Sequence, residues 1–308
     1  MDSFGRALAS RLGRAALTVW LVVTTVFVVM RSTGDPVRLL LPEDAPLEQI
    51  AALRQELGLD QPLPVQYVRF WRQAVSGDLG ESIRFRRPAA ELVLERLWPT
   101  AQLGFAAFAL AAVGGLTLGV FCALSRDTAF DRVSMATASL LQASPSFVIG
   151  ILLILFLSVR LGWLPSSGSG SLRHLVLPAL TVALITMASL ARLARSALLE
   201  VLRTEYVRVA RAKGLPERLV VVRHALRNAS LPVVTVLGLE LAALLTGAVV
   251  VETVFAWPGI GRLAVEAVAV RDYPVVQAVV LVVTLVFVAI NLMVDVSYLI
   301  LDPRVRHV

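Results

Sequence analysis

LWPTAQLGFAAFALAAVGGLTLGVFCALS, residues 97–125, lies between Arg96 and Arg126 and contains no charged side chain. An α-helix rises about 1.5 Å per residue, so about 20 apolar residues suffice to cross the hydrocarbon core of a bilayer. A backbone in lipid must satisfy its own hydrogen bonds, which a helix does within one segment. The stretch therefore predicts a membrane-spanning helix.

The rest of the chain repeats this pattern. Its 308 residues have a mean hydropathy of +0.77, and only 17% are charged, which is too apolar for an ordinary soluble domain of this size. Five further apolar runs are present, interrupted only by Glu240 in the fourth and Asp295 in the last: 15–30, 133–159, 174–191, 228–251 and 273–301. We predict an all-α polytopic membrane protein with six transmembrane helices.

The first run could be a secretory signal, because Arg6, Arg11 and Arg14 precede it. However, VVMRSTGDPV (28–37) follows it without a small-x-small cleavage site, so we expect a retained anchor.

The basic residues indicate the orientation. With the N-terminus inside, the cytoplasmic segments hold sixteen Arg and Lys residues, whereas the short outer loops hold four, namely Arg160, Arg173, Arg262 and Arg271. The basic residues of short loops set the orientation in the membrane, whereas a long segment such as 31–96 crosses largely regardless of its charge. Both termini are therefore expected in the cytoplasm. The net charge of +7 then reflects the inner face and its anionic lipid headgroups, and needs no nucleic acid.

Chemistry within the chain has little support. Cys122 is the only cysteine, and His174, His224 and His307 lie on separate segments, so no metal site is predicted. The chain lacks GxxxxGK[ST], and its one lysine is Lys213, so it has no P-loop for ATP. An intramembrane hydrolase is a remote alternative that would use Ser169 or Ser171 with His174, but SSGSGS (166–171) is typical of a flexible turn.

The most basic stretch is EYVRVARAKGLPERLVVVRHALRN (205–228), which the topology places in the cytoplasm between the fourth and fifth spans. Residues 205–213 favour a helix, Gly214 suits a left-handed stop, and Pro216 suits the first turn of a second helix. In that second helix Leu219, Val222 and Leu226 recur at helical spacing. The pattern predicts a rigid elbow whose amphipathic arm lies on a surface, either the membrane or another protein.

The pattern Ala210-x3-Gly214-x9-His224-x-Leu226 resembles the cytoplasmic coupling loop of ABC importer permeases. YVRVARAKGL (206–215) and RHALRNASLP (223–232) are similar to the branch that imports dipeptides, oligopeptides and nickel. Further segments match that branch in order: GDPV (34–37), GDLGES (77–82), LGWLPSSG (161–168), GAVVVETVFAWPGIGRL (247–263), RDYPVVQ (271–277) and NLMVDVSYLILDPRVR (291–306).

The resemblance implies a non-catalytic permease subunit in a bacterial inner membrane, forming half of a translocation pathway. Its implied partners are a similar permease, two cytoplasmic ATPase subunits that bind ATP and Mg²⁺, and an external solute-binding protein. The implied coupling residues are Arg208, where many importers have an acidic residue, and Ala210, Arg211, Lys213, Gly214, Arg218 and His224. Headgroup solvation is the alternative role for Arg211, Lys213 and Arg218, and an ATP-independent carrier or channel is the alternative function.

Polar residues within the spans have two interpretations. Glu240 lies in the middle of its span, so it lines the pathway or is protonated and bonded to a neighbouring helix. Four residues form one polar stripe on the last helix, for which we expect a structural role near its cytoplasmic end: Asn291, Asp295, Tyr298 and Asp302.

Smaller features complete the expected architecture. Gly115 and Gly119 are spaced for close helix packing, and Ser144-Pro145-Ser146 should bend the third span. We divide the chain into an N-terminus and first span (1–30), an external amphipathic segment (31–96), and a five-span core (97–308) with its coupling loop at about 200–228. Two helices are expected outside, after Pro46 and after Pro64, and they either dock on the spans or, with residues 256–270, receive the solute-binding protein.

Overall fold

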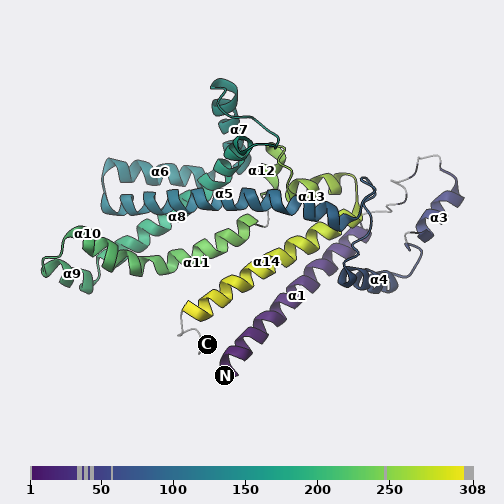
Figure 1. Cartoon of the computed structure of the whole chain (residues 1–308), viewed down its shortest axis with the longest axis horizontal. Helices are drawn as coiled ribbons and strands as arrows, with labels where there is room; N and C mark the ends of the chain where they lie inside the picture. Colours follow the sequence, from purple (N-terminus) through teal and green to yellow (C-terminus); the bar gives the residue numbers. More distant parts are fainter. Residues whose placement is uncertain are drawn as a thin grey trace. The chain divides into compact units, whose positions relative to one another are not determined.

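The computed structural model describes residues 2–32, 37, 41, 45–56, 58–245 and 248–301. Within these ranges the only regular secondary structure is helical, apart from one isolated bridge between Glu81 and Pro88, which confirms the all-α prediction (Figure 1). The chain divides into two compact units. The first contains Met1–Pro99 and Gly259–Val308, and the second is Thr100–Pro258.

Four of the described helices are long and apolar enough to cross a membrane. They are α1 (Asp2–Ser32), α5 (Ala89–Leu124), α8 (Leu172–Leu202) and α14 (Tyr273–Leu301). Two bent pairs raise the number to as many as six. The first pair joins α6 (Ala129–Ala143) to α7 (Ser146–Leu153) and its π-helical continuation η1 (Ile154–Arg160), and the second joins Glu217–Ser230 to Pro232–Leu244.

The bend predicted at Pro145 is confirmed, and it is a break of 110° rather than a mild kink. Proline has no N–H to continue the helical ladder, and it disfavours helical geometry in the residue before it. Ser144 accordingly is extended, with φ −88° and ψ 134°. The run at 228–251 was predicted too long, because α11 (Leu226–Leu245) ends before 251 and a separate helix, α12 (Val249–Val254), follows.

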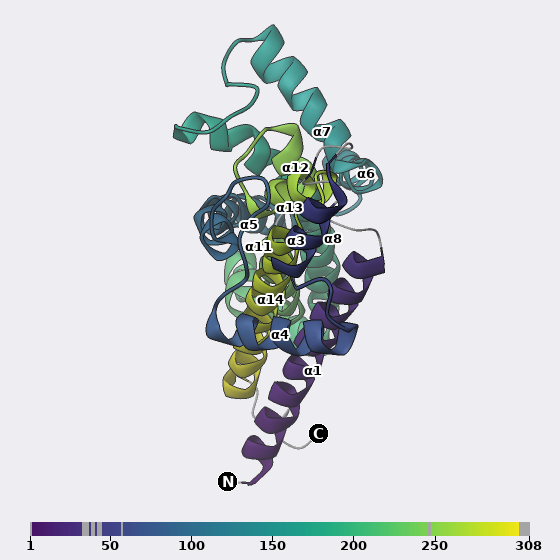
Figure 2. The same ribbon diagram turned by 90° about the vertical axis from the view of Figure 1, so that its right-hand side faces the viewer.

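In the first unit, α1 and α14 lie side by side and antiparallel, so Asp2 and Leu301 are at the same end (Figure 1 and Figure 2). Helix α13 (Ile260–Ala269) packs on α14 at the other end. There Ile260 and Val275 form an apolar core with Val93 from the first turns of α5.

Of the two helices predicted after Pro46 and Pro64, the first is present as α3 (Leu47–Glu56), and the second, α4 (Leu63–Ser76), begins one residue before Pro64. Helix α4 packs on α1, with the Tyr67 ring 5.3 Å from that of Phe27 and its hydroxyl 2.6 Å from Thr24 Oγ1. Val68 and Val75 of α4 are exposed, so the contact with α1 is made by the aromatic side chains.

In the second unit, α8 packs on α5, α6 and α11. A Cβ atom on Gly115 would lie 2.9 Å from Met187 O, and one on Gly119 would lie 2.5 Å from Ala191 O. Both distances are shorter than real Cβ contacts, so only glycine lets the two backbones approach this closely. The packing role predicted for Gly115 and Gly119 is therefore confirmed.

Candidate functional site

The basic stretch 205–228 forms a compact elbow between α8 and α11. Its first arm is α9 (Glu205–Ala212), and its second arm is α10 (Glu217–Leu219) with the π-helical turn η2 (Val220–Ala225). Gly214 has φ +76°, which confirms the predicted left-handed stop, and a Cβ there would meet no atom within 4 Å. Glycine is needed for its backbone angle rather than for space. Pro216 is the N-cap residue of α10, one position before the first turn that the sequence predicted for it.

The inner face of the elbow is apolar and buried. Val207 and Ala210 from the first arm contact Val220 from the second, and Leu215 between the arms packs against them. Val201 and Leu202 at the end of α8 complete this cluster. Burial of about 25 cal/mol per Å² of apolar surface stabilises the fold of the elbow. The two arms therefore form one unit with the end of α8.

Polar contacts also tie the two arms together. Arg211 donates two hydrogen bonds to Glu217, of 2.6 and 3.1 Å, in the bidentate geometry of a guanidinium and a carboxylate. The Arg211 guanidinium hydrogen-bonds the charged form of the Glu217 carboxyl and so lowers its pKa. Asn228 Nδ2 donates to the Tyr206 hydroxyl at 2.6 Å, which joins the first arm to α11. These contacts leave the elbow few internal degrees of freedom.

The outer face of the elbow is exposed and has both apolar and basic side chains. Of the predicted apolar stripe, Leu219 and Val222 are exposed and Leu226 is half-buried, whereas Val220 and Val221 are buried. Val209 is 51% exposed on the first arm. Lys213 and Arg218 are exposed and form no ion pair with any residue that the structure describes. This face has the composition of a protein-docking surface, with apolar anchors and free cations.

The remaining predicted coupling residues lie in or beside this elbow. Arg208 is exposed and pairs with Glu205 one turn earlier, at 2.5 Å. His224 is half-buried, and its carbonyl accepts a hydrogen bond from Asn228 at 3.4 Å. The seven coupling candidates thus divide into exposed cations and residues that shape the elbow.

The polar residues predicted within the spans lie elsewhere. Glu240 is half-buried on α11, and its carboxylate has a hydrogen-bond partner in Thr186 of α8. Of the predicted stripe, Asn291 donates to Phe287 O in its own helix at 2.9 Å. The side chains of Asp295, Tyr298 and Asp302 lie outside the described residues.

The Ser–His pair considered for a hydrolase lies at the start of α8. Ser171 is the N-cap residue of α8, and its Oγ lies 2.9 Å from His174 Nδ1. Among the described residues no carboxylate pairs with His174, so the pair lacks the third member of a triad. The described part of the chain likewise contains no cluster of three or more His, Cys, Asp or Glu side chains that could hold a metal ion.

Sequence reasoning missed a buried ion pair in the second unit. Arg195 of α8 donates two hydrogen bonds to Asp131 of α6, at 2.6 and 2.7 Å, and Asp131 is 2% exposed. Asp131 also accepts the Asp127 N–H at 3.0 Å. The two partners are 64 positions apart, so no local pattern could have paired them.

Two other buried carboxylates also hold distant segments together. Asp272 accepts the Ser82 hydroxyl at 2.5 Å and the N–H groups of Ile83 and Arg84, each at 3.2 Å. It thereby joins the two quoted motifs GDLGES and RDYPVVQ within the first unit. In the second unit, Glu252 is fully buried and accepts the Thr100 hydroxyl at 2.8 Å. Asp272 and Glu252 both lie in segments quoted for the family resemblance, which was the only sequence signal for these contacts.

Comparisons with known proteins match almost the whole chain. Residues 115–307 match the family described as "Binding-protein-dependent transport system inner membrane component", and residues 5–89 match its N-terminal counterpart. The "Glutathione transport system permease protein GsiC" of Escherichia coli O6:H1 is 44% identical over 291 residues, covering 94% of this chain and 95% of that relative. The protein of the same name from Salmonella paratyphi A has the same identity and coverage.

Solved structures show a similar fold. The MetNI methionine ABC transporter in an inward-facing conformation gives a TM-score of 0.55 at 22% identity, covering 66% of this chain and 93% of that one. An amino acid ABC transporter with histidines gives a TM-score of 0.53 at 16% identity, with 67% and 92% covered.

Proposed function

This chain belongs to the family of binding-protein-dependent transport system inner membrane components and is the permease subunit of an ABC importer, and from this premise we propose that ATPase subunits drive it through the elbow at 205–228. The subunit is a non-catalytic part of the transporter. In our proposal two cytoplasmic ATPases bind ATP and Mg²⁺, a similar permease forms the other half of the pathway, and an external solute-binding protein delivers the solute.

One observation carries this proposal: the elbow combines a rigid interior with an exposed docking face. A segment transmits displacement only when it moves as a unit, and coupling travels through packed, discrete elements. The buried contacts of Val207 and Val220, together with the Arg211–Glu217 ion pair, supply that rigidity. The exposed Val209, Leu219 and Val222 supply apolar anchors for a partner.

The seven coupling candidates then have two kinds of role. Arg208, Lys213 and Arg218 are exposed cations that contact the ATPase. The other four maintain the shape of the elbow: Ala210 and Arg211 by contacts between its arms, Gly214 by its backbone angle, and His224 by the hydrogen bond at its carbonyl.

The orientation proposed from the basic residues places both termini and the elbow in the cytoplasm. The antiparallel pairing of α1 and α14 supports a common side for Asp2 and Leu301. In this arrangement the core at 97–308 is anchored by the first span, and residues 31–96 lie outside.

The proposed cargo is a peptide or a related small solute. The similar proteins named glutathione transport system permeases support this class. Glu240 is proposed to line the pathway, because a carboxylate within a span seldom faces lipid. Asn291, Asp295, Tyr298 and Asp302 are proposed to stabilise α14 and its neighbours rather than to contact cargo.

Gly214→Val tests the elbow. A β-branched residue is strained at φ +76°, so the variant should insert normally but lose most ATP-driven uptake. Gly162→Val is the matched control, because Gly162 has φ +66° and an equally open surrounding, but lies between η1 and α8. Tagged wild type and both variants would be purified from the native membrane under mild detergent, and co-purifying subunits identified.

The outcomes separate the alternatives. The proposal is supported if a P-loop ATPase and a second permease co-purify with wild type. It also requires that Gly214→Val alone reduces ATPase recovery or coupling. If Gly214→Val and Gly162→Val reduced ATPase recovery or coupling equally, the cause would be a general effect of backbone strain. Transport by wild type without any ATPase would instead establish an autonomous carrier.

A further inference from the structure

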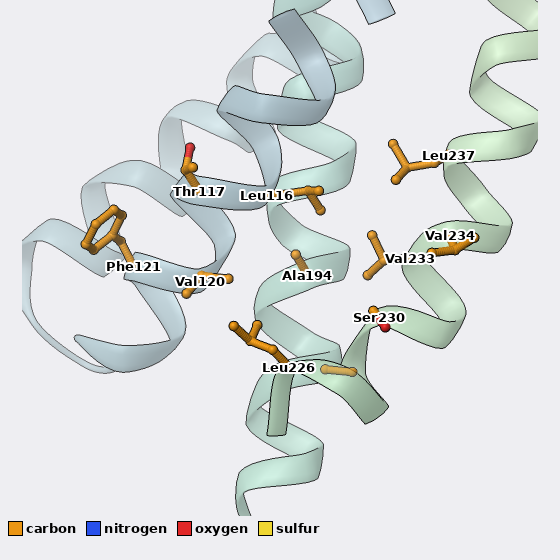
Figure 3. Close-up of a pocket in the computed structure, with 11 residues that line it drawn as sticks. Leu116, Thr117, Val120, Phe121, Ala194, Leu226, Ser230, Val233, Val234 and Leu237 are labelled. Atoms are coloured by element: carbon orange, nitrogen blue, oxygen red, sulfur yellow. The ribbon is translucent and has the colours of Figure 1, made fainter. Parts of the chain in front are cut away.

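The second unit contains an apolar cavity of about 400 Å³ between α5, α8 and α11 (Figure 3). Its wall includes Leu116 and Val120 of α5, Ala194 of α8, and Val233 and Leu237 of α11. It lies at the end of these helices where the elbow joins α8 to α11, beside the buried contacts of Leu198, Ala225 and Ala229. A volume of this size falls within the range of small-molecule sites, about 300–1,000 Å³.

The chemistry of the wall restricts the occupant to a hydrocarbon. The wall has two hydroxyls, and each donates its proton to the backbone of its own helix. Thr117 Oγ1 lies 2.7 Å from Val113 O, and Ser230 Oγ lies 2.8 Å from Arg227 O. A peptide backbone would lose its hydrogen bonds to water here without regaining them.

A free cation lies at the elbow end of the cavity. Arg227 precedes Ser230, which lines the cavity, by three positions on α11, so the two residues share one face of the helix. Side chains on a helix point toward its N-terminus, which places the guanidinium beyond the cavity, on the elbow side. Neither Arg227 nor the exposed Arg223 one turn earlier forms an ion pair within the described ranges.

We propose that this cavity binds one acyl chain of an anionic phospholipid, whose phosphate pairs with Arg227. The wall matches the chain, and the unpaired guanidinium matches the phosphate, which Arg binds through planar bidentate hydrogen bonds. Basic residues immediately cytoplasmic of a span are typical of anionic lipid recognition. The bound lipid would wedge between α8 and α11, the two helices that the elbow connects.

The test uses the full chain purified from native membranes with its partner subunits in mild detergent. A phosphatidylglycerol carrying a photoactivatable group on one acyl chain is the probe, with the same-tailed phosphatidylcholine as the zwitterionic comparison. After illumination, labelled peptides are identified by mass spectrometry. We expect at least several-fold enrichment of label at 116–121 and 230–237 over other exposed apolar segments, and stronger labelling by phosphatidylglycerol.

Two variants with matched controls identify the parts of the site. Val234→Trp fills the cavity from a half-exposed position and should remove most of this label, whereas Leu239→Trp, at a similarly exposed position of α11 outside the cavity wall, should keep it. Arg227→Gln should abolish the preference for phosphatidylglycerol while leaving labelling of the cavity. Arg192→Gln removes an exposed cation from the face of α8 opposite Ala194 and should change neither.

Other results would overturn the proposal. Label spread evenly over the apolar surface, or unchanged by Val234→Trp, would exclude a specific acyl site. Equal labelling by both lipids in wild type would exclude recognition of the anionic headgroup. If a photoactivatable amino acid at position 234 cross-links the second permease and no lipid, the cavity is a protein interface. Co-purification of partner subunits with each variant checks that it is folded.

Discussion

Removing the Arg195 guanidinium should be among the most destabilising single changes in the second unit. Arg195→Met deletes two charge-assisted hydrogen bonds, of 2.6 and 2.7 Å, and leaves Asp131 with only the Asp127 N–H. Hydrogen bonds to charged groups contribute about 1.5–3 kcal/mol each. The Asp131 side chain is 3% exposed, so its charge would remain in a nearly dry site. Breaking a buried pair in this way costs about 3–5 kcal/mol.

The control is an ion pair four residues away that water reaches. Asp127→Asn breaks the contact with Arg126, whose side chain is 44% exposed against 73% for Asp127, and exposed pairs contribute about 0–1 kcal/mol. Equilibrium unfolding of the purified variants in SDS–detergent mixed micelles, followed by far-ultraviolet circular dichroism, would measure both changes.

A double variant tests the physical cause. Asp131→Asn removes the charge that Arg195→Met leaves without a partner, so the combined variant should be more stable than Arg195→Met alone. The reasoning would be refuted if Arg195→Met destabilised no more than Asp127→Asn, or if the two changes at 131 and 195 were simply additive.

Three further perturbations address other contacts. Gly119→Val should prevent α5 from packing on α8 and sharply reduce the yield of folded protein, because its Cβ would lie 2.5 Å from Ala191 O. Gly114→Ala should be tolerated, because the three atoms nearest to its Cβ belong to the flexible Met187 side chain. Fluorescence-detected size exclusion would compare the two variants. Ser82→Ala should lower the free energy of unfolding by about 1–3 kcal/mol by removing a buried donor to Asp272, while Ser76→Ala, on an exposed helix end, should change it by less than about 0.5 kcal/mol. Tyr67→Phe should lower the free energy of unfolding by about 0.5–1.5 kcal/mol, because it removes the hydrogen bond with Thr24. A change near zero in thermal unfolding would mean that α4 does not depend on that bond.

Local features were predictable because their physics is local. An uncharged run longer than about 20 residues must satisfy its backbone as a helix in lipid, so the apolar runs indicated the fold class without tertiary information. Gly214 and the Gly115–Gly119 spacing were equally predictable, since a left-handed angle and a close helix approach both favour glycine. The family followed from short motifs distributed along the chain.

The effect of each proline depended on its surroundings. Pro99 and Pro178 lie inside the continuous helices α5 and α8, whereas Pro145 stands at a break of 110°. A proline removes one hydrogen bond and can bend a helix, but the packing of the segment beyond it decides the angle. Helix α7 packs against α8 and α12, and a Cβ on Gly150 would lie 3.1 Å from Phe255 Cε2, far along the chain.

The composition of this chain therefore determined that it is a helical membrane protein, because desolvation acts on each segment separately. Only the tertiary structure decided which polar groups meet, because a buried carboxylate is stabilised by whichever donors the fold places next to it. Asp131 accepts hydrogen bonds from Arg195, 64 positions away, and Asp272 accepts one from Ser82, 190 positions away. It also decided that Val220 and Val221 are buried while Leu219 and Val222 stay exposed, because the π-helical turn η2 shifts the register of the elbow.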